Sequence, residues 1–287
     1  MNFRIFTDTG CDIPADLLQQ WNMTCVNLTF HDEKAGKTYV TEDISIHDFY
    51  QQMRDGTVFK TAAANVEDFR MAFESALADG QDILYLGFSS GLSATCNFAR
   101  EAAEEIMSEY EGSKVVVVDT LCASAGYGLL LKLSVDKKAA GATIDEVASF
   151  AEDTKLKVCH WFTVDDLKYL KAGGRISATT ALVGGMLNIK PVMKMDNNGK
   201  LISVSKVRGR KAALKAIADL YAETALDKKD GVVFISHGDC IDDANQLADM
   251  LKENSGATVQ VTTYVGPVIG SHSGPGTLAL FFLANER

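Results

Sequence analysis

The first half of the sequence alternates short runs rich in β-branched and aromatic residues with longer amphipathic runs, and this alternation constrains the fold more than any other feature. The candidate strands are residues 3–6, 24–30, 83–88 and 115–118. The longer runs at residues 92–110, 121–140 and 144–154 have the spacing of helices. Strands that alternate with helices favour a parallel sheet covered by helices.

The pattern changes after about residue 155. A strand candidate at residues 158–164 is followed by two alternating runs, residues 189–195 and 201–207, which flank Asn198-Gly199. Asn-Gly between alternating runs is a strong hairpin signal, so we expect an antiparallel pair. Helical runs at 210–226 and 242–253 alternate with strand candidates at 232–236 and 258–264. We therefore predict an N-terminal α/β domain over residues 1–155 and a C-terminal α+β domain over residues 156–287.

Composition excludes several classes of protein. With 287 residues, 47% of them hydrophobic, the chain can bury one large core or two moderate ones. A net charge of -10 disfavours binding to nucleic acid through a basic face. Asp8 comes too early for a secretory signal, and no run approaches the roughly 20 apolar residues of a membrane span. We expect a cytoplasmic protein with no nucleic-acid partner and no stable membrane insertion.

The sequence carries no motif for a metal or a common cofactor. The six cysteines have no C-x-x-C spacing, and no two histidines have the spacing of metal ligands. There is no P-loop for ATP, and Gly126 and Gly128 lack the full spacing of a dinucleotide site. We expect neither a metal nor a cofactor.

Two segments bear hydroxyls ahead of a helix. Residues 89–95 follow a strand candidate, so that Ser90 and Ser93 meet free backbone N–H groups where the helix dipole favours an anion. Capping of the helix by these serines is an equally good interpretation. Thr61 lies in residues 59–65, which taken alone indicate an ordinary loop with Asn65 as an N-cap. The carboxylate of Asp12, ahead of Pro14, is expected to cap another helix.

Two glycine-rich segments carry the remaining candidates. Gly173-Gly174-Arg175 suits either an anion clamp or a turn that ends a helix. Residues 266–276 concentrate Gly and Pro around His272, which predicts a rigid loop that presents the imidazole. His160, by contrast, is expected to be a strand residue satisfied by its neighbours. The apolar run at residues 278–283 cannot be assigned to helix or strand by its periodicity.

Five segments, in this order, closely resemble the DegV family, whose members include the fatty-acid-binding subunits of bacterial fatty acid kinase. The resemblance spans essentially the whole chain. It rests on Thr7-Asp8-Thr9 with Asp12-Ile13-Pro14, Ser89-Ser90 with Leu92-Ser93-Ala94-Thr95, Asp166-Leu167 through Tyr169-Leu170-Lys171 to Gly173-Gly174-Arg175-Ile176-Ser177, Asn188-Ile189-Lys190-Pro191, and the segment around His272.

The resemblance implies an acyl chain in a tunnel between the two domains, with residues 266–287 returning to the domain junction. The implied ligand is a long-chain fatty acid, and a separate fatty acid kinase subunit would phosphorylate its carboxylate, so that this chain is a carrier and not an enzyme. Candidate tunnel walls are residues 181–187 and 278–283. The carboxylate would be held at Thr61, Ser93, Ala94 and His272. Supporting or partner-facing positions would be Arg175, Ser90, Gly270 and Ser271.

The sequence departs from the family pattern near the head group. The family's usual Thr-Ser-Gln-Pro-Ser is Thr61-Ala62-Ala63-Ala64-Asn65 here, and the glycine after the key serine is Ala94. Three other interpretations stay open at this stage. Ser93 and His272 would be the nucleophile and base of an acyl-transfer enzyme, the site would be degenerate and empty in a regulatory protein, or the bound anion would be a phosphate.

Overall fold

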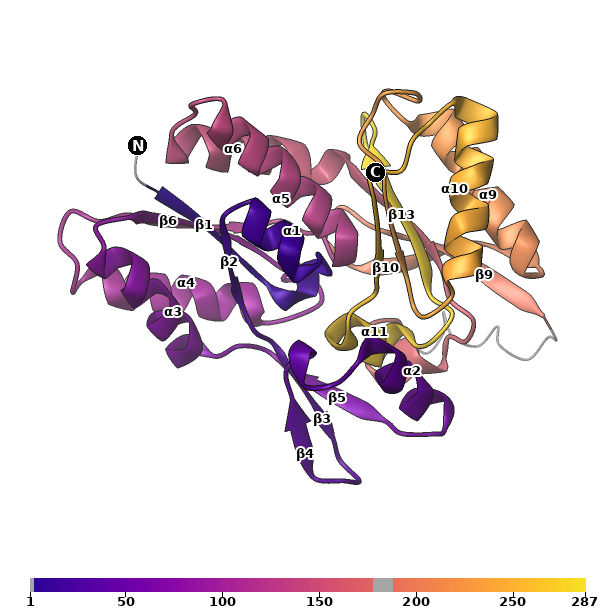
Figure 1. The fold of residues 1–287 in the computed structure, drawn as a ribbon, viewed down its shortest axis with the longest axis horizontal. Helices are drawn as coiled ribbons and strands as arrows, with labels where there is room; N and C mark the ends of the chain where they lie inside the picture. Colours follow the sequence, from indigo (N-terminus) through magenta and orange to yellow (C-terminus); the bar gives the residue numbers. More distant parts are fainter. Residues whose placement is uncertain (1–2, 178–187) are drawn as a thin grey trace.

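The computed structural model describes residues 3–177 and 188–287, and its first large unit is built on a parallel sheet (Figure 1). The strand order is β2-β1-β6-β7, and every pairing is parallel, which confirms the predicted sheet. Both faces are covered, with α3 and α4 on one side and α5 and α6 on the other. The strands are β1 (Phe3–Asp8), β2 (Met23–Val26), β6 (Asp82–Gly87) and β7 (Val115–Asp119). The helices are α1 (Ala15–Gln20), α3 (Val66–Ala78), α4 (Thr95–Met107), α5 (Ser124–Ala139) and α6 (Ile144–Thr154).

Of the helix N-caps predicted from the sequence, the structure confirms that at Asn65 and contradicts that at Asp12. Asn65 caps α3 and forms a capping box with Asp68, as its position ahead of the helix predicts. Asp12 does not cap α1, because Pro14 occupies the N-cap position and makes no side-chain cap. The Asp12 carboxylate is buried and accepts hydrogen bonds from Ser124 Oγ at 2.5 Å and from the backbone N–H of Gly266 at 2.9 Å. Burial raises its pKa to about 7.

The second unit is a six-stranded sheet in the order β10-β9-β8-β13-β11-β12. The hairpin of β9 and β10 is antiparallel, as Asn198-Gly199 predicts. The apolar run at residues 278–283 is the strand β13, which is buried because it pairs with β8 on one side and β11 on the other. The strands are β8 (Val158–Thr163), β9 (Ile189–Met195), β10 (Leu201–Arg208), β11 (Phe234–His237), β12 (Val261–Tyr264) and β13 (Leu278–Leu283). Two helices, α9 (Arg210–Thr224) and α10 (Ile241–Ser255), cover one face.

A third, small sheet corrects the sequence-based assignment at residues 24–30. The run was predicted as one strand, but it divides into β2 and β3, which belong to different sheets. The backbone N–H of Leu28 donates to Thr9 Oγ1 at 3.0 Å where the chain leaves the parallel sheet. The small sheet, in the order β4-β3-β5, packs on α2 through buried aromatic rings of Phe30, Phe49 and Phe59. Its elements are β3 (Thr29–Asp32), β4 (Lys37–Tyr39), α2 (Ile46–Arg54) and β5 (Phe59–Ala62).

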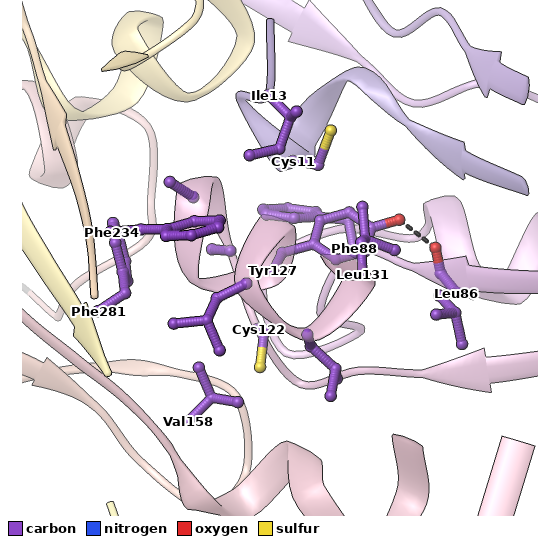
Figure 2. Packing of buried hydrophobic residues seen from close by; sticks show 14 of the residues in the cluster. Cys11, Ile13, Leu86, Phe88, Cys122, Tyr127, Leu131, Val158, Phe234 and Phe281 are labelled. Carbon is purple, nitrogen blue, oxygen red and sulfur yellow. Dashed lines mark hydrogen bonds between the residues drawn. The ribbon is translucent and has the colours of Figure 1, made fainter. Parts of the chain in front are cut away.

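Helix α5 lies between the two large sheets and joins their cores (Figure 2). Its Tyr127 packs among residues of the first sheet and donates a hydrogen bond to the carbonyl of Leu86, while Phe234 and Phe281 approach the same cluster from the second sheet. A Cβ atom at Gly126 would lie 2.4 Å from His160 Nε2 on β8. The second sheet therefore approaches α5 as closely as a glycine backbone allows.

Two short helices complete the described fold. The segment after β12 forms α11 (Pro267–Ser273) and not the predicted rigid loop, with Pro267 in its first turn. It contacts α7 (Lys168–Ala172), the small sheet and α2, and the chain then continues into β13. We propose a division between two domains near residue 155, where α6 ends and the chain enters the second sheet. Within the described ranges, no helix has the length and apolar character needed to cross a membrane.

Candidate functional site

A cavity of about 490 Å³ lies where the two large sheets meet. Its floor is the face of the second sheet that looks toward α5. On this face Ala279 is paired with Phe162 on one side and with Ser236 on the other, and all three line the cavity. The small side chain of Ala279 leaves room between bulkier neighbours. Further apolar lining comes from Phe88, Leu92, Leu170, Met195, Leu201 and Ile269.

The lining also contains polar candidates from the sequence. Thr61 lies on β5 and His272 on α11, and Thr61 Oγ1 is 2.7 Å from His272 Nε2 although the residues are 211 positions apart. Ser93 and Arg175 also line the cavity. Ala94 and Ser90 belong to the same lining, so six of the eight predicted site residues are brought together around one cavity.

Gly270 and Ser271 are placed differently. Both are buried, and neither is among the residues that line the cavity. Ser271 Oγ donates to the carbonyl of Pro267 at 2.7 Å, and a Cβ atom at Gly270 would lie 2.7 Å from the hydroxyl of Tyr50. Their positions fit a supporting role through packing of α11 and do not fit a surface that faces a partner.

In the serine-rich segment before α4, Ser93 and Ser89 have different roles. The helix begins at Thr95, and Ser93 Oγ lies 2.8 Å from Thr95 Oγ1 and accepts from the Thr95 N–H at 3.3 Å. Ser89 is buried and donates to the carbonyl of Gly199, at the tip of the β9–β10 hairpin, at 2.9 Å. Ser93 therefore lies beside the cavity, whereas Ser89 links the β9–β10 hairpin to the unit built on the parallel sheet.

The buried carboxylate of Asp8 holds the start of this segment in place through hydrogen bonds. Its carboxylate accepts from the Phe88 N–H at 3.1 Å, from the Gly10 N–H at 2.9 Å and from the hydroxyl of Tyr85 at 2.6 Å. Burial raises its pKa. Phe88 lines the cavity while Asp8 does not, so Asp8 orients the loop rather than contacting a ligand.

The polar part of the cavity carries positive charge. Arg175 is half-buried, its Nη1 donates to the carbonyl of Gly173 at 2.5 Å, and it takes part in none of the ion pairs found in the described part of the chain. Burial and the nearby Arg175 charge lower the pKa of His272 to about 4, so its imidazole is neutral at pH 7. An anion entering this region would meet a guanidinium that lacks a carboxylate partner.

His160 lines the cavity as well, and sequence reasoning did not place it there. It was expected to be satisfied by its neighbours, and it is. Nδ1 lies 2.9 Å from the carbonyl of Val158, and Nε2 accepts from the Ala123 N–H at 3.2 Å. Its proximity to the cavity depends on the packing of β8 against α5, which alternation along one strand does not reveal.

Acid should destabilise the protein in part through His160. Burial lowers the pKa of its imidazole to about 3, whereas histidine in an unfolded chain titrates near 6.5. As the pH falls, the unfolded chain takes up this proton first, so stability is lost from about pH 6.5 downward. Urea unfolding at pH 7 and pH 5 should show a contribution of about 2 kcal/mol from this group. His160→Gln keeps a donor and an acceptor and should lose less stability; an unchanged pH dependence would contradict this expectation.

The two predicted tunnel walls, residues 181–187 and 278–283, differ in what the structure describes. Residues 181–187, a predicted tunnel wall, lie outside the described residues. In β13, Ala279 and Phe281 line the cavity, whereas Leu278, Leu280 and Phe282 pack in the separate core under α9 and α10. Within residues 3–177 and 188–287, no three His, Cys, Asp or Glu side chains are grouped to hold a metal ion.

The fold and cavity together define an α/β protein with two large sheets, a mostly apolar cavity between them and a cationic, hydroxyl-bearing region at its lining. The family model described as "Uncharacterised protein, DegV family" matches residues 2–285. The chain therefore belongs to the DegV family.

Relatives support this assignment over the full length. A DegV domain-containing protein of Clostridium perfringens is 37% identical over 286 residues, which cover 99% of this chain and 98% of the relative. A DegV lipid-binding protein from Thermotoga maritima has 29% identity, a TM-score of 0.87 and complete coverage of both chains. A fatty-acid-binding DegV family protein from Thermus thermophilus has 29% identity and a TM-score of 0.87, with 99% of this chain and 100% of that chain covered.

Proposed function

We propose that this chain binds one long-chain fatty acid, with the acyl chain in the cavity and the carboxylate near Thr61, Ser93, Ala94 and His272. The observation that carries the proposal is a mostly apolar cavity whose lining also includes Thr61, Ser93, His272 and the guanidinium of Arg175. Solved relatives from Thermotoga maritima and Thermus thermophilus, described as lipid-binding and fatty-acid-binding, support it.

The dimensions and energetics suit such a ligand. From Thr277, which directly precedes β13, to Phe281 within it, four steps of nearly extended chain span about 13 Å, and both residues line the cavity. Each buried methylene contributes roughly 0.8 kcal/mol, so an extended chain binds tightly with few polar contacts. A fatty acid carboxylate is ionised at pH 7, and hydrogen bonds to a charged group are stronger than neutral ones. The apolar lining supplies affinity, and the polar groups fix the orientation.

The carrier role follows as the second part of the proposal. The chain has no P-loop, and we propose that a fatty acid kinase subunit phosphorylates the bound carboxylate while this protein, in the cytoplasm, acts as carrier without catalysis of its own. Arg175, half-exposed beside the site, would lie near that partner. In an assay with a bacterial fatty acid kinase subunit and ATP, the protein loaded with fatty acid should yield acyl phosphate. If the loaded protein gave no product, the carrier role would be overturned, but the proposed fatty acid binding would not.

The geometry disfavours the acyl-transfer alternative. A nucleophile and its base lie within hydrogen-bonding distance of each other, with a third group orienting the base. Ser93 Oγ instead pairs with Thr95, and His272 Nε2 pairs with Thr61. His272 Nδ1 is buried without a partner in the described structure, so no carboxylate orients the imidazole. The cavity volume likewise disfavours a degenerate site, since Ala62 and Ala63 line it without filling it.

Removing the two hydroxyls tests the head-group assignment. The double variant Thr61→Ala, Ser93→Ala should bind palmitate roughly tenfold to hundredfold more weakly, because two hydrogen bonds to a charged group are lost. Binding of hexadecanol, which has the same chain and no carboxylate, should change much less. Ser134→Ala is the control, because its buried hydroxyl bonds the carbonyl of Leu130 away from the cavity. Equal losses of affinity for palmitate and hexadecanol would show that Thr61 and Ser93 do not bind the carboxylate.

A further inference from the structure

Ser273 is buried, with 5% of its surface exposed, and it lines the cavity. Its hydroxyl has no hydrogen-bond partner in the described structure. The other buried hydroxyls in the lining do have partners: Ser124 bonds Asp12, Ser236 bonds Ser124, and Thr277 donates to the carbonyl of Gly274 at 2.8 Å. A buried donor without an acceptor destabilises the folded state, so its presence calls for an explanation.

The position of Ser273 on α11 suggests what its partner is. Val268, Ile269, His272 and Ser273 all line the cavity, and their spacing of three and four residues puts them on one face of the helix. Ser273 therefore follows His272 at the end of α11 that reaches the polar part of the cavity. A serine side chain has three staggered rotamers, and rotation about one bond redirects the hydroxyl.

We propose that Ser273 Oγ donates a hydrogen bond to the carboxylate of the bound fatty acid, as a third hydroxyl beside Thr61 and Ser93. This inference rests on the proposed function and adds a binding residue to the same site. The Thr61 and Ser93 hydroxyls already have partners in the protein, whereas the Ser273 hydroxyl has none to give up. A carboxylate accepts at about four lone-pair sites, so it accommodates all three donors.

A serine kept for binding affects stability differently from a purely structural serine. Without ligand, the Ser273 hydroxyl is a buried donor that loses its hydrogen bonds to water on folding and forms none within the protein. Ser273→Ala removes that donor, so the ligand-free variant should be at least as stable as the wild type. The same change should weaken fatty acid binding. Opposite signs for stability and affinity are typical of a residue kept for binding.

The test compares delipidated wild type, Ser273→Ala and the control Ser134→Ala. Palmitate should bind to Ser273→Ala about tenfold more weakly or worse, hexadecanol within twofold of wild type, and the thermal midpoint without ligand should be equal or higher. Ser134→Ala should bind palmitate as the wild type does. Ser273→Thr, which restores a hydroxyl, should recover part of the affinity.

Any of four results would overturn the proposal. An unchanged palmitate affinity in Ser273→Ala would show that the hydroxyl does not reach the carboxylate. Equal losses for palmitate and hexadecanol, or a lower thermal midpoint without ligand, would show that Ser273 acts through packing or an intramolecular bond. Wild-type protein that binds no palmitate would overturn the proposed function itself, and the role of Ser273 with it.

Discussion

Ala279→Phe should reduce the affinity for palmitate at least hundredfold while leaving the protein folded. Ala279 lies on the cavity floor between Phe162 and Ser236. A phenyl ring there would occupy space that the acyl chain needs. Displacing four methylenes from the cavity costs roughly 3 kcal/mol, which is more than a hundredfold in affinity. Titration of delipidated protein with palmitate and with decanoate measures the effect, and decanoate should lose less because it needs less room.

The control for this prediction is Ala139→Phe, the same change at an exposed alanine near the end of α5. It should bind palmitate as the wild type does. Ala279→Val should fall between wild type and Ala279→Phe, because it fills less of the cavity. Full palmitate affinity in folded Ala279→Phe would mean that the acyl chain does not cross this part of the cavity floor.

Gly126→Ala should lower the free energy of unfolding by about 2–3 kcal/mol, the typical cost of overpacking a core. The added Cβ atom would lie 2.4 Å from His160 Nε2 and 2.5 Å from Phe281 Cδ1. His160 cannot move aside easily, because both of its ring nitrogens are held by backbone groups. The packing of α5 on the second sheet would have to open.

Helix propensity alone predicts the opposite sign for Gly126→Ala. Replacing glycine by alanine inside a helix ordinarily stabilises by about 1 kcal/mol. A glycine at an exposed position inside α4, Glu101→Gly, calibrates that effect and should destabilise by about 0.5–1 kcal/mol. Urea unfolding of both variants gives the comparison. A Gly126→Ala variant as stable as the wild type, or more stable, would show that the two sheets do not press on α5 as described.

The sequence predicted elements whose signals are local. The β-branched run at residues 115–118 indicated a strand, and β7 is that strand. Asn65 and Asp68 form the capping box that the sequence suggests. The hairpin at Asn198-Gly199 follows from its turn chemistry. These features need no knowledge of the rest of the chain.

The errors occur where tertiary packing overrides local signals. Gly and Pro around His272 indicated a loop, yet Pro267 suits the first turn of a helix, and Gly270 is required by the close approach of Tyr50 to α11. The split of residues 24–30 into β2 and β3 likewise depends on the small sheet that residues 59–62 complete. Neither arrangement is visible within a short window of sequence.

The candidate site shows the same division. Thr61 alone indicated an ordinary loop, and its closeness to His272, 211 residues away, was implied only through the family resemblance. His160 and Ser236 line the cavity because of strand register, and no motif marked them. Ser273 lies in the segment around His272 that the sequence marked, but the sequence singled out only the histidine there. A serine whose hydroxyl lacks a partner can be recognised only once all of its neighbours are placed.

The central claim is that the cavity holds a fatty acid, and mass spectrometry of the small molecules extracted from purified, denatured protein tests it most directly. We expect a near-stoichiometric fatty acid in the wild type and much less in Thr61→Ala, Ser93→Ala purified in the same way. The mass of the extracted acid would also define the chain length and unsaturation. A wild-type protein that is empty and also refuses added palmitate would contradict the account.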